Sequence, residues 1–131
     1  MIEFKEMEIL PSIHGDKKRL HVGRNVNLVN TLFNTRSGEI FIGDDTIFGY
    51  NCMIITGRHP RIEGKLKKHP VPIKGYDIII GKNCWISSGV IVTGNVTIGD
   101  NCVIGAGAVV TKNIPSGKFA VGIPAKIKSE V

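Results

Sequence analysis

His59 and a set of basic side chains are the residues with the clearest capacity for chemistry. The segment 57–70 carries five Lys or Arg and one Glu, a net charge of +4. A neutral imidazole, with an ordinary pKa of about 6.5, can accept a proton at pH 7, which makes His59 a candidate general base. Lysines also gather near the C-terminus, at positions 112, 126 and 128. Such charges attract nucleic acid, acidic membranes, acidic proteins or phosphorylated small molecules.

Covalent and metal chemistry have less support in the sequence. The Gly-x-Ser-x-Gly pattern that presents a nucleophilic serine is absent. Cys52, Cys84 and Cys102 are not spaced with a histidine as zinc ligands would be, so no metal is expected. An odd number of cysteines fits a reducing compartment better than a disulfide framework, and the cytoplasm is the expected location. We expect no membrane span, because no apolar run approaches 18 residues.

The elements that position these residues follow from an internal repeat. Four related pentads begin at Val22, Ile42, Ile80 and Ile98, so their starts are 20, 38 and 18 residues apart. Within the 18-residue unit an aliphatic residue recurs every six positions, at Ile80, Ile86, Val92, Ile98, Ile104 and Val110. This period matches neither a helix nor a simple strand alternation. It predicts short strands joined by bends, three of which complete one turn of a coil.

A coil of this kind is an all-β, single-stranded parallel β-helix. Each turn stacks its aliphatic residues on the next at about 4.8 Å, so Ile80 should lie against Ile98 and Ile86 against Ile104. The three cysteines occupy the fifth position of a hexad and should point inward as small buried apolar groups. The spacing does not fix the hand of the coil, and the general rule for parallel crossovers favours a right-handed one.

The composition agrees with one folded domain of 131 residues, of which 42% are hydrophobic and 21% charged. We expect an N-terminal cap or arm at 1–21, a coil at 22–114 and a C-terminal extension at 115–131. One long inserted loop, at about 57–76, interrupts the coil. Long excursions are usually functional or disordered. His59 lies where this loop leaves the coil, beside a rigid face, whereas most of the loop lysines are interpreted as a solvated surface.

Several stretches together are similar to the hexapeptide-repeat acyltransferases. They are Gly57–Pro60, Ile78–Gly89, Val96–Lys112 and Gly122–Lys126, and the similarity spans residues 22–128. The chain most resembles the branch of maltose and galactoside acetyltransferases and polysaccharide O-acetyltransferases. The resemblance implies a left-handed coil, against the crossover rule. It also implies a homotrimer with active sites between subunits and acetyl-CoA as co-substrate.

The resemblance also assigns roles to individual residues. It implies that His59 is the catalytic base, and that the cofactor-binding positions are Trp85, Ser88, Ala106, Thr111, Lys112 and Lys126. The expected reaction is direct acetyl transfer to a hydroxyl of a sugar or polysaccharide precursor, without an acyl-enzyme. Backbone N–H groups at Ser87–Gly89 are candidate donors to the oxyanion.

Other functions remain open at this point. The same histidine would serve N-acetylation of an amino sugar. A zinc enzyme similar to the γ-class carbonic anhydrases needs three histidine ligands, but His59 and His69 are ten apart and His14 and His21 lie far upstream. A non-enzymatic coil would leave the loop unexplained. Nucleic acid is not an expected partner, because no stacking surface or known motif accompanies the charge.

Overall fold

The computed structural model describes residues 1–59, 61–66 and 72–131. In these residues most strands fall into three parallel sheets. Sheet A has the order β1 (Ser12–His14), β3 (Leu32–Asn34), β6 (Met53–Ile55), β11 (Ile91–Thr93), β14 (Val109–Val110). Sheet B has the order β2 (Leu20–Val22), β4 (Ile40–Ile42), β9 (Ile78–Ile80), β12 (Val96–Ile98). Sheet C contains β5 (Ile47–Phe48), β10 (Trp85–Ile86), β13 (Val103–Ile104), β15 (Lys118–Val121) and β16 (Lys126–Glu130).

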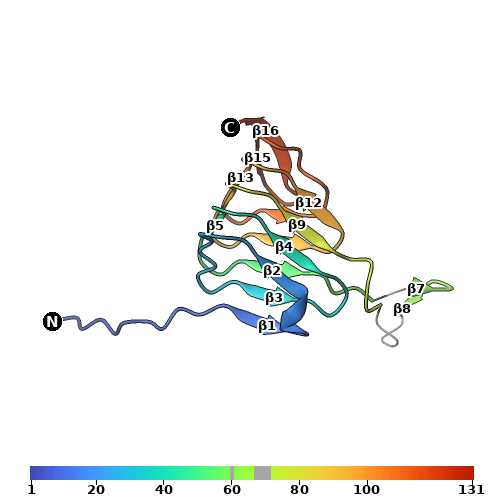
Figure 1. Cartoon of the computed structure of the whole chain (residues 1–131), viewed down its shortest axis with the longest axis horizontal. Coiled ribbons are helices and arrows are strands. Elements are labelled where there is room, and N and C mark those ends of the chain that lie inside the picture. Colours follow the sequence, from blue (N-terminus) through green and yellow to red (C-terminus); the bar gives the residue numbers. More distant parts are fainter. Residues whose placement is uncertain (60, 67–71) are drawn as a thin grey trace.

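The chain visits the sheets in a fixed rotation, from A to B to C and back to A. Strands that follow one another in sequence therefore lie on different faces, and each strand pairs in parallel with the strand one turn away. The result is a triangular prism of stacked turns, with β1 near one end and β15 near the other (Figure 1). The expected parallel β-helix is confirmed.

The core of the prism is a set of stacked aliphatic ladders. Ile80 pairs with Ile98 and Ile86 with Ile104, as the hexad period predicts, and all four side chains are buried. The alternate residues face outward, as Ile79 does between Ile80 and Ile78. Cys52, Cys84 and Cys102 are buried free thiols, as expected from their place in the hexad.

The pentads are the corners between sheets B and C. Their fourth residues, Asn25, Asp45, Asn83 and Asn101, all have left-handed backbone conformations with φ between 54° and 62°. Asparagine and aspartate tolerate this region better than other side chains. The amides also form a ladder, since Asn83 Nδ2 donates to Asn101 Oδ1 at 2.9 Å. The pentad repeat is therefore explained by the geometry of one corner.

Both ends of the coil extend further than the regular repeat indicates. The parallel ladders begin at Ser12, before residue 22, and a short 3-10 helix, η1 (Lys17–Arg19), lies between β1 and β2. Residues 1–11 form an extended arm that leaves the coil (Figure 1). Beyond Pro115, β15 still pairs in parallel with β13, and only β16 reverses direction. Among the described residues, no helix has the length and apolar character needed to cross a bilayer.

Candidate active site

His59 lines a cavity of about 320 Å³ at the corner between sheets A and B. The other lining residues are His14, Asn34, Arg36, Ile55, Gly57 and Arg58. Three of them come from successive turns of sheet A, because His14 is in register with Asn34 and Asn34 with Ile55. Parallel pairing thus places a histidine and an amide from different turns beside the base of the loop that carries His59.

Asn34 is held in place by a buried hydroxyl. The Thr56 hydroxyl donates to the Asn34 carbonyl at 2.7 Å and accepts the Ser37 N–H at 3.1 Å. The side-chain oxygen of Asn34 accepts the Arg36 N–H at 2.9 Å. Among the described residues, no hydrogen bond uses the Asn34 side-chain NH₂, which leaves a donor available in the cavity.

The loop after β6 begins and ends at one place on the coil. A Cβ added to Gly94 would lie 2.7 Å from the Thr56 carbonyl oxygen and 2.9 Å from the Tyr76 side chain, so both ends of the loop pack on this glycine. The Arg58 guanidinium lies over the Tyr76 ring, 5.7 Å from its centre. Between these ends the structure describes a small hairpin of β7 (Arg61–Ile62) and β8 (Lys65–Leu66). Lys67, Lys68 and His69 lie outside the described residues.

The residues expected to contact coenzyme A fall into two groups in one chain. Ser88 and Ala106 lie at the corner between sheets C and A, and Trp85 points outward from β10 with 52% of its surface exposed. The Ser88 hydroxyl accepts the Tyr50 N–H at 2.9 Å. Thr111 and Lys112 follow β14 at the corner between sheets A and B, and Lys126 begins β16. None of these six lines the His59 cavity, so a single chain does not bring them together with the histidine.

The expected oxyanion donors at Ser87–Gly89 are largely occupied. The Ser87 N–H donates to the Ile104 carbonyl at 3.0 Å and the Gly89 N–H to the Tyr50 carbonyl at 2.8 Å. The expectation is therefore wrong for the N–H groups of Ser87 and Gly89, because both already donate hydrogen bonds to backbone carbonyls of neighbouring turns. The Asn34 NH₂, which sequence reasoning missed, is one donor that lines the same cavity as His59 among the described residues. Its place beside His59 follows from the ladder that joins β1, β3 and β6, which the sequence spacing does not reveal.

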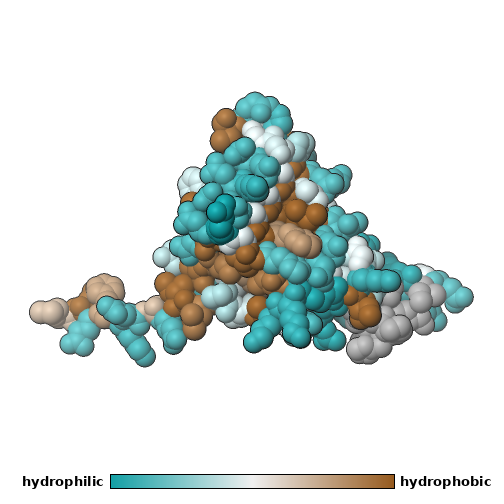
Figure 2. Space-filling view, viewed as in Figure 1, coloured by the Kyte–Doolittle hydropathy of each residue, from teal (hydrophilic) through white to brown (hydrophobic). Residues whose placement is uncertain are grey.

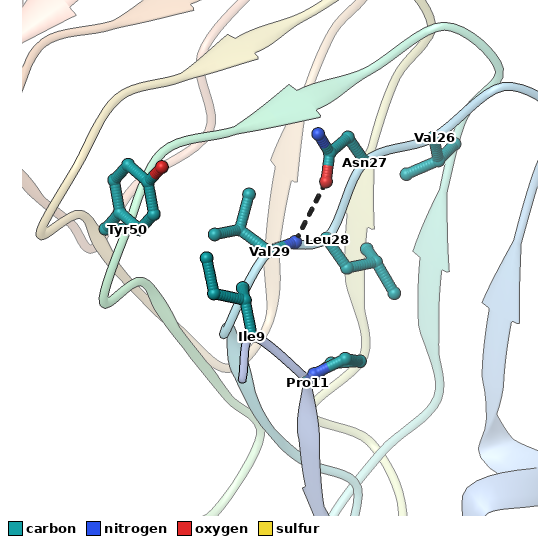
Figure 3. Close-up of a pocket in the computed structure, with 7 residues that line it drawn as sticks. All are labelled: Ile9, Pro11, Val26, Asn27, Leu28, Val29 and Tyr50. Atoms are coloured by element: carbon teal, nitrogen blue, oxygen red, sulfur yellow. Dashed lines mark hydrogen bonds between the residues drawn. The ribbon is translucent and has the colours of Figure 1, made fainter. Parts of the chain in front are cut away.

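A second hollow, of about 500 Å³, lies at the base of the arm (Figure 3). Ile9 and Pro11 of the arm line it together with Val29 and Tyr50 of the coil, and Asn27 Oδ1 accepts the Val29 N–H at 3.2 Å. This hollow is larger than the His59 cavity, but it holds no carboxylate, imidazole or lysine. The His59 cavity is therefore the better candidate for proton transfer.

Some charges elsewhere on the coil are paired. Arg19 binds Glu39, whose other oxygen is 3.1 Å from His21 Nε2, and these contacts hold the pKa of Glu39 below its ordinary value. Burial raises the pKa of the Cys84 thiol to about 11 and also raises that of Cys52. No three His, Cys, Asp or Glu side chains in the described ranges are grouped to hold a metal.

The fold and the repeat define the class to which the chain belongs. Residues 77–112 match the family model described as "Bacterial transferase hexapeptide (six repeats)". The coil is left-handed, like those of the hexapeptide-repeat acetyltransferases that it resembles, so the general crossover rule does not hold here. The chain carries the repeat and the fold of the hexapeptide-repeat acyltransferases.

Within that family its relatives are sugar O-acetyltransferases. The chain is 37% identical over 112 residues to the galactoside O-acetyltransferase of Escherichia coli K12, covering 86% of this chain and 54% of that protein. A maltose O-acetyltransferase from Clostridium difficile 630 superimposes with a TM-score of 0.74 at 39% identity, and the match covers 86% of this chain and 59% of that chain. A galactoside acetyltransferase in complex with coenzyme A superimposes with a TM-score of 0.75 at 37% identity. The match covers 86% of this chain and 55% of that chain. The chain thus spans about half the length of the curated relatives it matches.

Proposed function

We propose that this protein is an acetyl-CoA-dependent O-acetyltransferase that modifies a sugar hydroxyl. The observation that supports this function most is the cavity that His59 and Asn34 line together on a rigid coil, where the Asn34 side-chain NH₂ makes no hydrogen bond among the described residues. Its relatives add support, because they are galactoside and maltose O-acetyltransferases and one of them binds coenzyme A.

The proposed reaction needs one base and one oxyanion donor. His59 accepts the proton of the sugar hydroxyl while its oxygen attacks the thioester carbon. The Asn34 NH₂ donates to the oxyanion that forms. The C–S bond then breaks, the acetyl group remains on the sugar oxygen, and the coenzyme A thiolate takes the proton from the His59 imidazolium. No acyl-enzyme forms, since the thioester is already activated.

We further propose a homotrimer with the active sites between subunits. Residues expected to bind coenzyme A lie at two different corners of one chain, and a neighbouring copy would complete each site. In this arrangement Trp85, Ser88, Ala106 and Thr111 line the cofactor groove, while Lys112 and Lys126 neutralise its phosphates. The three unpaired thiols favour a reducing, cytoplasmic location.

The test is release of free thiol from acetyl-CoA against a panel of sugars, nucleotide-linked sugars and amino sugars. We expect thiol release with sugar hydroxyls, and His59→Ala to lower turnover by at least about 100-fold, as loss of a positioned base does. His21→Ala is the matched control, because His21 is an exposed histidine stacked on Phe41 outside the cavity. An active His59→Ala protein would remove the assigned base. Transfer to amino groups alone would favour N-acetylation.

A further inference from the structure

The His59 cavity has a marked positive charge. Two arginines, Arg36 and Arg58, and two histidines, His14 and His59, are among its seven lining residues. No Asp or Glu of the described chain lines it. A neutral hexose gains little from such an environment, whereas an anion gains charge-assisted hydrogen bonds.

The two cavity arginines differ from the arginines of the coil surface. Arg19 is paired with Glu39, and Arg24 lies 3.4 Å from the Asp44 carboxylate. Arg36 and Arg58 take part in none of the ion pairs that the described residues form. Their charges are therefore available to a ligand.

Both side chains are nevertheless anchored. The backbone N–H of Arg36 donates a hydrogen bond to the Asn34 side chain. The Cγ of Arg36 would lie 3.2 Å from a Cβ added to Gly15, so the stem of the Arg36 side chain packs on the preceding turn. Arg58 lies over the Tyr76 ring. Anchored guanidinium groups bind planar carboxylates and phosphates better than mobile ones, because less freedom is lost on binding.

The phosphates of coenzyme A do not account for this charge within one chain. Arg36 follows β3, whereas Lys112 follows β14, three turns further along sheet A. At about 4.8 Å per turn the two levels are separated by roughly 14 Å. The cationic side chains around His59 thus lie in the same cavity as the proposed base and away from the level of the proposed phosphate site at Lys112.

We propose that the acceptor is an anionic sugar, whose carboxylate or phosphate is bound by Arg36 and Arg58 with His14 beside them. The anion then holds a neighbouring hydroxyl against His59. This inference rests on the proposed function, because that function is the reason to expect a sugar as the ligand. Binding of the anionic group can be measured whether or not an acetyl group is transferred.

The experiment compares galactose, galacturonate and galactose 1-phosphate by calorimetric binding and by thiol release from acetyl-CoA. We expect both anionic sugars to bind at least about tenfold more tightly than galactose, as charge-assisted hydrogen bonds require. The tighter of the two identifies carboxylate or phosphate as the recognised group. Arg36→Gln should remove this preference, while Arg24→Gln, an exposed arginine of another corner, should retain it.

The outcomes separate the two proposals. Equal affinity for the three sugars, or an equal loss in both arginine variants, overturns the anion site. Preferential binding of the anionic sugars without any thiol release supports the anion site and contradicts acetyl transfer. Thiol release with galactose as fast as with its anionic analogues supports acetyl transfer and overturns the anion preference.

Discussion

At the scale of single residues, His59 and Asn34 show the reach and the limit of sequence reasoning. The place of His59 beside the coil was predictable because it stands where the hexad period stops and its surroundings resemble a known motif, while its role as the base stays a prediction. The sequence does not predict that Asn34, His14 and Arg36 lie near His59, because their proximity depends on the register between turns and not on sequence distance. The six positions expected to bind coenzyme A stay predictions, since they rest on the resemblance alone.

Lys126 provides a test of the cofactor assignment at this scale. Its replacement by alanine should raise the KM for acetyl-CoA more than it lowers kcat, because a phosphate contact far from the reacting atoms contributes mainly to binding. Initial rates over a range of acetyl-CoA concentrations measure both constants. Lys17→Ala, in η1 at the opposite end of the coil, is the control. An equal loss with a truncated acetyl-pantetheine donor would argue against phosphate recognition.

We expect the buried thiol of Cys84 to lower the free energy of unfolding as the pH becomes alkaline. Burial raises its pKa from 9.0 to about 11, so the unfolded chain loses this proton first as the pH rises. The contribution of Cys84 is therefore fully present below pH 9 and is lost as the pH approaches 11. The urea concentration at the unfolding midpoint should decline between pH 8 and pH 11, and the midpoint of Cys84→Ala should decline less over the same range. Parallel curves for the two proteins would contradict a buried, neutral thiol.

At the scale of elements, the hexad period was enough to predict the strands, the inward ladders and the buried cysteines. It did not predict the N-terminal end of the coil, because β1 precedes the first pentad at Val22 and carries no repeat signal of its own. It also did not show that β15 continues in parallel past Pro115. The proline precedes this strand, where no ladder N–H is required of it.

Asn83 tests the explanation of the pentad corners. With φ at 54° and its amide bonded to Asn101, replacement by alanine should cost about 1–2 kcal/mol of unfolding free energy, mainly from the left-handed backbone. Asn83→Gly should cost less, because glycine removes the steric penalty and loses only the ladder bond. Urea denaturation measures both. Lys82→Ala, exposed in the same corner, should be nearly neutral, and an equal loss there would make the effect nonspecific.

At the scale of the whole molecule, the outer faces of the prism remain apolar in places. Ile47, Met53, Ile79 and Trp85 are all exposed, and Figure 2 shows apolar surface along the middle of the coil and at the base of the arm. Exposed apolar surface of this kind marks interaction sites. This agrees with the proposed trimer, in which neighbouring prisms cover one another.

Hybrid trimers test whether the active site is shared between copies. His59→Ala removes the base, and Ala106→Trp, an exposed position, should block the cofactor groove. If each site combines the histidine of one copy with the groove of another, equal co-expression should restore about a quarter of wild-type activity, since half of the copies supply each intact part. Thiol release by the purified mixture is the measurement. No recovery in hybrids shown to contain both chains would place the whole site in one subunit.

The loop between β6 and β9 departs from the coil and returns to it at the same glycine, Gly94. Its length therefore adds nothing to the rise of the stack, and the turns above and below keep their register whatever the loop contains. A segment attached in this way can be exchanged between related proteins as a cassette. Selection can then alter the residues that the loop contributes to the His59 cavity without disturbing the ladders on which folding depends.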